Sequence, residues 1–301
     1  MPNRAETRSA KPAQRFPPWL RKRVSTGEAA ARVSSLLAEL GLETVCTRAH
    51  CPNLAECFAR GTATFLILGN SCTRSCRFCA IPTSPPGPLR DEEPEAVAEA
   101  CDKLGLRHVV ITSVTRDDLT DGGAAHFAKT IHAVRLRMPK TVIEVLTPDF
   151  LGRAASLDIV LDAGPDIFNH NVETVPRLYP QVRPEADYRR SLDVLAHAKR
   201  RGDRDAASLY TKSGLMVGLG ETADEVRAVL CDLRGAGCDI VTIGQYLAPS
   251  AAHVPVARFV EPPEFEAWEA EARALGFAAV AAGPFVRSSY HADSLFENRR
   301  E

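Results

Sequence analysis

A repeated alternation of strand-like and helix-like segments from residue 63 onwards constrains the fold of this chain most strongly. Continuous Val/Ile/Leu runs predict buried strands, and helical segments of ten or more residues follow them, which is typical of a parallel sheet. Six such units suit an open or partial β/α barrel. A doubly wound sheet is the alternative, but no GxGxxG follows the first strand. The predicted strands are 63–69, 108–114, 141–148, 166–172, 209–220, 239–247 and 278–286, and the predicted helices are 94–106, 123–138, 152–163, 186–201, 222–235 and 262–275.

The segments on either side of this repeat are predicted to be separate parts of the chain. Prolines make residues 1–25 irregular, and we interpret them as a flexible basic arm that packs through Trp19 and Leu20. No apolar h-region is present, so we expect no secretory signal peptide here, and an Arg-rich organelle-targeting segment is the weaker alternative. Residues 26–62 form an extension whose first part, 26–40, is helical and ends at Gly41. The barrel then spans 63–286, and 287–301 form a tail.

Charge and hydropathy exclude several function classes. The net charge is -1 and the pI is about 6.7, so we expect no general affinity for nucleic acid. No apolar run approaches the roughly 18 residues that a membrane span needs, so we expect no membrane insertion. With 45% hydrophobic residues, the chain can bury a sizeable core.

Nine cysteines are unusual for a chain without a secretory signal. Six of them fall between Cys46 and Cys79, and this clustering in a long chain predicts metal binding in a reducing, cytoplasmic compartment. The remaining three are interpreted as inert small hydrophobic residues that lie within or just after helices and face the core; they are Cys101, Cys231 and Cys238.

The second cysteine group follows the first predicted strand as Cys72-x3-Cys76-x2-Cys79. Its loop is short, so three thiolates can converge on one iron–sulfur cube and leave one iron open for a small molecule. A zinc site is the alternative, although zinc would require a fourth ligand nearby.

The first cysteine group, Cys46-x4-Cys51-x5-Cys57, offers three further thiolates. It requires a fourth ligand or another open position. His50 is a candidate, but a lone histidine beside a cysteine is more often only a neighbour.

Polar residues gather after the predicted strands, at 115–123, 147–150, 169–174, 218–222 and 245–250. In a β/α barrel the carboxyl ends of the strands carry the active site, so this distribution predicts chemistry at one face. Polar loops are common in any case. That general tendency does not account for Asn169, His170, Asn171 and Glu173. The NHN run continues a strand, so its side chains should point partly inward.

These motifs resemble the lipoyl synthase family of radical S-adenosylmethionine (SAM) enzymes. CxxxCxxC resembles the superfamily signature, and the upstream CxxxxCxxxxxC narrows the resemblance. It runs from about residue 17 to 292, through GTATFLILG, VVITSVTRDDLTDGGAAHF, IEVLTPDF, FNHNVETVPRLYPQVRP, TKSGLMVGLGET, TIGQYLAPS and GPFVRSSYHA.

The resemblance implies two [4Fe–4S] clusters. Cys72, Cys76 and Cys79 would hold the cluster that binds SAM. Cys46, Cys51 and Cys57 would hold an auxiliary cluster, whose fourth ligand would be the serine before Tyr in RSSY, Ser289. An alkoxide suits iron less well than a thiolate, so the bond to Ser289 should be the easiest to break. A tail hydroxyl that hydrogen-bonds its neighbours is the alternative.

The implied reaction inserts sulfur from the auxiliary cluster at carbons 6 and 8 of a protein-bound octanoyl-lysine. The implied partners are octanoylated lipoyl-carrier domains, namely 2-oxoacid dehydrogenase E2 subunits and the glycine cleavage H protein, with a ferredoxin- or flavodoxin-type electron donor. The candidates for SAM contacts are Asn169, Asn171, Glu173, Gly218, Gly220 and Glu221.

Four other polar residues have two interpretations each. Arg183 is a candidate polar clamp or an exposed salt-bridged arginine. Asp117 and Asp118 could grip a ribose, although helix capping is the preferred interpretation. Lys212 would point into the barrel mouth or lie on its solvated rim.

Two other function classes remain open from the residues. Another radical SAM enzyme with an auxiliary cluster, such as a biotin-forming or methylthiolating enzyme, would differ in where the extra cysteines lie. A two-cluster electron carrier is usually small, so the large core argues against it.

Overall fold

A curved, eight-stranded sheet forms the centre of the part of the chain that is described. The computed structural model describes residues 15–21, 28–48, 51, 53–59, 64–203 and 209–289. Within these ranges the strands follow one another in chain order across the sheet. They are β1 (Glu43–Thr44), β2 (Thr64–Ile67), β3 (His108–Ser113), β4 (Val142–Leu146), β5 (Ile167–Asn169), β6 (Tyr210–Val217), β7 (Ile240–Gln245) and β8 (Ala279–Gly283).

Strands β2 to β8 are parallel, and only β1, at one edge, runs antiparallel to its neighbour β2. The edge strands β1 and β8 are not paired with each other in the described sheet, so the barrel is partial. This confirms the predicted partial β/α barrel. The parallel order follows from the helical segments between strands, because each helix returns the chain to the same edge of the sheet.

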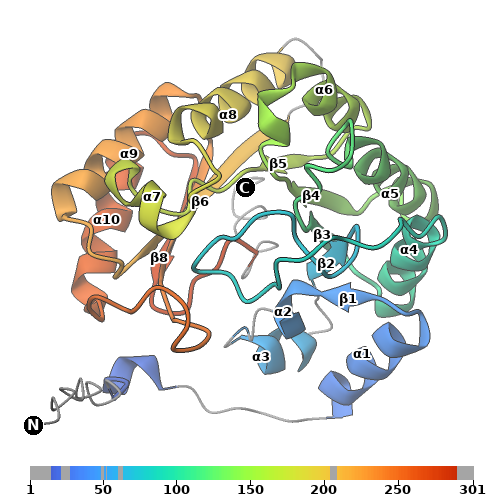
Figure 1. Ribbon diagram of the computed structural model, residues 1–301, viewed down its shortest axis with the longest axis horizontal. Helices are drawn as coiled ribbons and strands as arrows, with labels where there is room; N and C mark the ends of the chain where they lie inside the picture. Colours follow the sequence, from blue (N-terminus) through green and yellow to red (C-terminus); the bar gives the residue numbers. More distant parts are fainter. Residues whose placement is uncertain are drawn as a thin grey trace, which may run out of the picture.

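Helices cover the outer face of the sheet, as Figure 1 shows. The α-helices are α1 (Glu28–Glu39), α2 (Val45–Arg48), α3 (Leu54–Ala59), α4 (Glu93–Leu104), α5 (Ala124–Arg137), α6 (Ala154–Asp162), α7 (Tyr179–Val182), α8 (Tyr188–Gly202), α9 (Ala223–Gly235) and α10 (Pro262–Ala274). The 3₁₀ turns are η1 (Pro18–Leu20), η2 (Phe150–Gly152) and η3 (Pro176–Leu178). No helix in the described ranges combines the length and apolarity that crossing a membrane requires.

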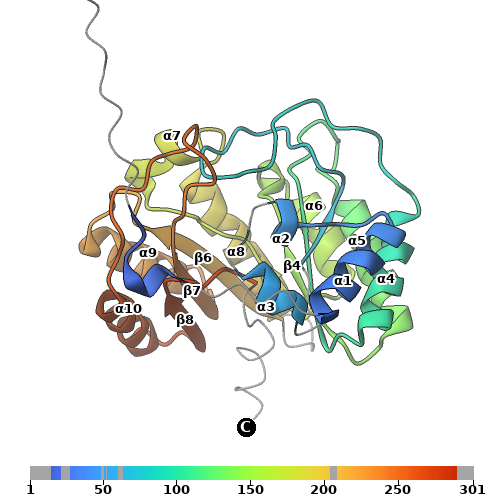
Figure 2. The ribbon, with the colours of Figure 1, turned by 90° about the horizontal axis from the view of Figure 1, so that it is seen from below.

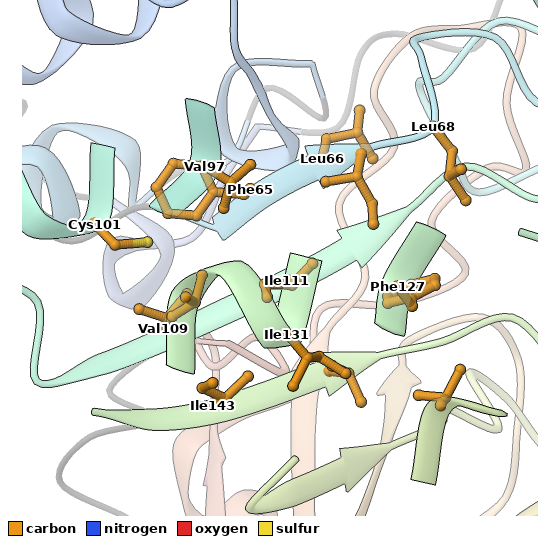
Figure 3. Close-up of a cluster of buried hydrophobic side chains, with 14 of the residues drawn as sticks. Phe65, Leu66, Leu68, Val97, Cys101, Val109, Ile111, Phe127, Ile131 and Ile143 are labelled. Atoms are coloured by element: carbon orange, nitrogen blue, oxygen red, sulfur yellow. The ribbon is translucent and has the colours of Figure 1, made fainter. Parts of the chain in front are cut away.

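Two apolar clusters lie between the sheet and its helices. Figure 3 shows the first, where side chains of β2, β3 and β4 such as Phe65 and Ile111 meet Phe127 of α5. The second packs β6 and β7 against α9 and α10, with Trp268 among its largest members. Strands β2 to β7 are buried along most of their length on both faces, which explains their continuous rather than alternating hydrophobicity.

The three isolated cysteines do not share one environment. Cys101 and Cys238 are fully buried, as predicted, but Cys231 is exposed, so its predicted core position is wrong. Helix α9 buries Val226, Val229, Leu230 and Leu233. Cys231 follows Leu230 by about 100° of helical rotation and therefore faces solvent.

The open side of the sheet is occupied by the short helices of the amino-terminal extension. Figures 1 and 2 both place α2 and α3 there. The amino-terminal segment 15–21 also packs on the barrel: Leu20 is buried, and the indole N–H of Trp19 donates to the backbone oxygen of Val260 at 3.2 Å. The predicted packing through Trp19 and Leu20 is confirmed, whereas residues 1–14 and 22–27 lie outside the described residues.

Candidate active site

A cavity of about 520 Å³ lies inside the barrel and is lined by residues from near both ends of the described chain and from the strands between them. Many of the residues that line it end a strand or directly follow one, including Ser113, Leu146, His170 and Gln245. The chemistry-bearing residues therefore gather at the carboxyl-terminal edge of the parallel sheet, as the sequence predicted. The cysteines that line this cavity are Cys46, Cys51, Cys72, Cys76 and Cys79, and its serines include Ser289.

The CxxxCxxC loop presents all three of its thiols to the cavity. Two backbone N–H groups, those of Thr115 and Arg74, point at the sulfur of Cys72, at 3.3 and 3.4 Å. Burial raises the pKa of Cys76 to about 12 and that of Cys79 to about 11, and the neighbouring cysteines add to both shifts. Three thiols on one short loop that line one cavity, with N–H donors aimed at the sulfur of Cys72, supply the donor types of an iron–sulfur cluster.

Arg74, inside this loop, anchors the loop to the barrel. Its side chain is almost fully buried and forms ion pairs with Asp117 at 2.7 Å and Asp149 at 2.6 Å. Arg190 binds the other oxygen of Asp149, also at 2.7 Å. A largely buried, hydrogen-bonded network of this kind restrains the loop. The spacing of the cysteines gave no signal for this role of Arg74.

The preferred helix-capping role of Asp117 and Asp118 is wrong. Asp117 binds Arg74, and Asp118 binds Arg116 at 2.9 Å. The carboxylate at the start of α5 is instead Asp121, which accepts the backbone N–H groups of Gly123 and Ala125. Both aspartates are thus used in side-chain ion pairs.

The first cysteine group lies on the short helices at the open side of the sheet. Cys46 is buried on α2, and its carbonyl oxygen accepts the N–H of Cys51 at 3.0 Å. Burial and the neighbouring Cys51 raise the pKa of Cys46. Cys57 lies on α3 and is not among the residues that line the cavity, and His50 falls outside the described residues. Ser289, from the other end of the chain, lines the same cavity.

Asn171, Glu173 and Arg183 form a polar group on the cavity wall. The amide of Asn171 donates to Glu173 at 3.1 Å, and its Oδ1 has no hydrogen-bond partner among the described residues. The backbone of Glu173 has φ +65° and bonds to Gly214 and Met216. Its burial raises the pKa of its carboxyl.

Arg183 is 7% exposed, so it is not the exposed arginine that the sequence allowed. It donates to the backbone oxygen of Asn171 at 2.8 Å and lies over the ring of Tyr179. No described carboxylate lies within ion-pair distance of its guanidinium. A buried cation without such a partner is costly unless an anionic ligand group meets it.

Asn169 and Lys212 lie in the barrel interior but do not line the cavity. Lys212 binds both oxygens of Glu144, at 2.9 and 3.0 Å, and Asn169 donates to the same carboxylate at 2.9 Å. At 1% exposure, Lys212 does not lie on a solvated rim, so that predicted position is wrong.

The Gly218–Glu221 turn also lies away from the cavity lining. The Glu221 carboxylate accepts the N–H groups of Gly218 and Leu219, at 2.6 and 2.9 Å, and so closes the turn on itself. Gly218 has φ +94° and lies against the amide of Gln245, which does line the cavity. Gly220 has φ +109°, a backbone conformation that favours glycine.

Comparison with known proteins gives one consistent result. A family model described as the radical SAM superfamily matches residues 66–244. The lipoyl synthase of Methylococcus capsulatus is 57% identical over 280 residues, which are 93% of this chain and 86% of that protein. The lipoyl synthase of Caldanaerobacter subterraneus subsp. tengcongensis is 56% identical over 279 residues, which are 93% of this chain and 96% of that protein.

Solved structures resemble this chain in fold alone. The [FeFe]-hydrogenase maturase HydG superposes with a TM-score of 0.57 at 15% identity, over 85% of this chain and 63% of that one. Streptococcus suis SuiB bound to its precursor peptide SuiA superposes with a TM-score of 0.56 at 10% identity, over 77% of this chain and 52% of that one.

Proposed function

The chain belongs to the lipoyl synthase family of the radical SAM superfamily, and on this premise we propose how its residues divide the work of sulfur insertion. The enzyme inserts two sulfur atoms into a protein-bound octanoyl chain, and its cofactors are SAM and two [4Fe–4S] clusters. When bound, these groups supply the radical that removes hydrogen from the acyl chain and the sulfur that replaces it. The single observation that carries the assignment of residues is that both cysteine groups reach one cavity.

We propose that Cys72, Cys76 and Cys79 hold the cluster that binds SAM. The two N–H groups aimed at Cys72 stabilise a negatively charged sulfur, and the ion pairs of Arg74 keep the loop in place. Three protein ligands leave one coordination position for a small molecule.

Cys46, Cys51, Cys57 and Ser289 are proposed to hold the second cluster. Two of these thiols and the hydroxyl already line the cavity, and Cys57 lies on the same short segment as Cys51. Three soft sulfur donors and one harder oxygen make an unequal donor set, in which the oxygen is the ligand most readily lost.

SAM would lie against Asn171, Glu173 and Arg183. The guanidinium of Arg183 supplies the positive charge that a carboxylate requires, and the unpartnered Oδ1 of Asn171 can accept a hydrogen bond from an amine or hydroxyl. Asn169, Gly218, Gly220 and Glu221 are proposed to support this wall and the neighbouring Gln245 from behind rather than to touch SAM.

Lipoyl-carrier proteins are the substrates that this function implies. We propose octanoylated E2 subunits of 2-oxoacid dehydrogenases and the glycine cleavage H protein as the particular partners. A ferredoxin- or flavodoxin-type donor would supply electrons, and the reaction would take place in the cytoplasm. The proposed division of labour places the auxiliary ligands on residues 26–62, the SAM site on 63–286 and the last ligand on 287–301.

Two cysteine variants test the assignment. Cys76→Ala should abolish release of 5′-deoxyadenosine while the protein keeps about half of its iron. Cys51→Ala should still cleave SAM but form no lipoyl product. The assay is anaerobic incubation with an octanoyl-lysine peptide, reductant and SAM, followed by mass spectrometry for two added sulfurs. Lipoyl product from Cys51→Ala would contradict the second assignment, and failure of the intact protein to release 5′-deoxyadenosine would leave only the electron-carrier function.

A further inference from the structure

The short segment 284–289, called the tail segment below, lies directly against the sheet. Gly244 is an interior residue of β7, where its neighbours are Ile243 and Gln245. Its φ is not positive, so its backbone conformation does not require glycine. A Cβ atom at position 244 would instead lie well under 3.0 Å from the carbonyl oxygen of Val286, closer than Cβ atoms approach other atoms in proteins. Glycine at this position marks the close approach of a second backbone.

The same tail segment is bound from its other side by the amino-terminal extension. The side-chain amide of Asn53 donates to the carbonyl oxygen of Phe285 at 2.7 Å, across 232 residues of sequence. Asn53 is 1% exposed, and it lies between Cys51 and Cys57. Its own carbonyl oxygen accepts the N–H of Cys57 at 2.9 Å. Figure 2 shows the red segment that follows β8 lying beside α3, the helix that begins just after Asn53.

We propose that Gly244 and Asn53 are positioning residues, which together seat the tail segment so that Ser289 meets the amino-terminal cysteines. Gly244 leaves room for the backbone of Val286 on the sheet side, and Asn53 holds the preceding carbonyl on the extension side. Ser289 follows Val286 by three residues and lines the cavity with Cys46 and Cys51. This inference rests on the proposed function, because it is the proposed ligand Ser289 that the two residues place.

The neighbouring strand supplies a matched control. Gly283 of β8 pairs directly with Gly244. A Cβ atom at position 283 would lie 3.5 Å from the side chain of Val286, an ordinary contact distance. Gly283→Ala and Gly244→Ala therefore add the same methyl group on paired residues, and each methyl group lies beside Val286. Only Gly244→Ala displaces the backbone of Val286.

Hydrogen–deuterium exchange of the full-length holoenzyme tests the seating without reference to turnover. In Gly244→Ala, amide exchange in residues 284–289 should be at least tenfold faster than in the unsubstituted protein, and exchange in β3 should be unchanged. In Gly283→Ala, the amides of residues 284–289 and of β3 should exchange at rates within about twofold of those in the unsubstituted protein. Equal exchange of the tail segment in the two variants would overturn the role of Gly244.

Asn53→Asp tests the second contact and serves if Gly244→Ala does not fold. A carboxylate of the same shape cannot donate to the oxygen of Phe285, so tail exchange should again rise several-fold. Unchanged exchange would overturn the role of Asn53.

Two further measurements separate this inference from the proposed ligand role of Ser289. Mössbauer spectra of Gly244→Ala should show a changed signal for one iron of the second cluster, and lipoyl product should fall at least tenfold. If the tail segment exchanges faster while the spectra and the product remain normal, the seating is supported and the ligand role of Ser289 is refuted.

Discussion

Lys212→Met is predicted to destabilise the protein strongly, because it leaves Glu144 as a buried charge without its counter-ion. Glu144 is fully buried in the barrel interior, and Lys212 lies within 3.0 Å of both of its oxygens. Burial opposes ionisation of this carboxyl, but the charge of Lys212 and the hydrogen bond from His108 outweigh it and lower the pKa of Glu144 to about 2. The carboxylate is therefore charged at neutral pH only because these partners are present.

The expected loss in the free energy of unfolding is about 3–5 kcal/mol, the usual cost of removing one partner of a buried ion pair. For a chain of 301 residues this corresponds to a lower thermal midpoint by about 5–8 °C. Differential scanning calorimetry of the anaerobic holoprotein at pH 8 measures the shift.

The double variant Lys212→Met/Glu144→Gln provides the control. It removes both charges and retains an amide oxygen that Asn169 can bond, so it should recover most of the lost midpoint. The reasoning would be refuted if the double variant lowered the thermal midpoint by as much as Lys212→Met and Glu144→Gln do together. The two side chains would then not be coupled.

The pH dependence has a defined direction. A pKa lowered by folding stabilises the native state above the ordinary glutamate pKa of about 4.3, and this contribution is lost as the pH falls towards 2. In Lys212→Met the pKa of Glu144 rises, so the deficit relative to the unsubstituted protein should shrink between pH 8 and pH 5. A constant deficit would show that Glu144 does not titrate in the variant.

Two further predictions concern the barrel rim. Asp149→Asn weakens the ion pairs with Arg74 and Arg190. We therefore expect the holoprotein to lose iron several-fold faster during anaerobic gel filtration. Retention of iron at the unsubstituted rate would contradict this. Thr222→Ala removes the hydroxyl of the capping box at the start of α9, and a loss of about 1 kcal/mol should lower the thermal midpoint by roughly 1–3 °C without altering SAM cleavage.

The sheet was predictable from the sequence because long Val/Ile/Leu runs, such as 108–114, specify buried parallel strands by themselves. Helix α1 and its end at Gly41 were predictable for a similar reason: the helical spacing is local, and Gly41 takes φ +62°. By contrast, β1, α2 and α3 are two to six residues long and are held by tertiary contacts. Elements this short carry too little periodicity to be predicted.

The cysteines of the candidate site were predictable because their spacing carries the chemistry, but their polar partners were not. Arg183 and Lys212 are single charged residues in the sequence, and only the folded chain shows that both are buried. Asp117 was assigned to a cap since local geometry favours capping, while its actual partner, Arg74, is 43 residues away. Distant pairings of this kind leave no periodic signal.

The bond between Asn53 and Phe285 has a consequence for the order in which the molecule is completed. A ribosome that adds about 5–20 residues per second requires roughly 10–50 s to travel from one partner to the other. During most of that interval the emerging polypeptide has both groups of thiols but lacks Ser289, whose hydroxyl is the proposed last ligand. If the amino-terminal thiols and Ser289 hold the second cluster, as proposed, delivery of iron and sulfide to these thiols has to wait until translation is nearly finished, or else proceed on an unclosed chain.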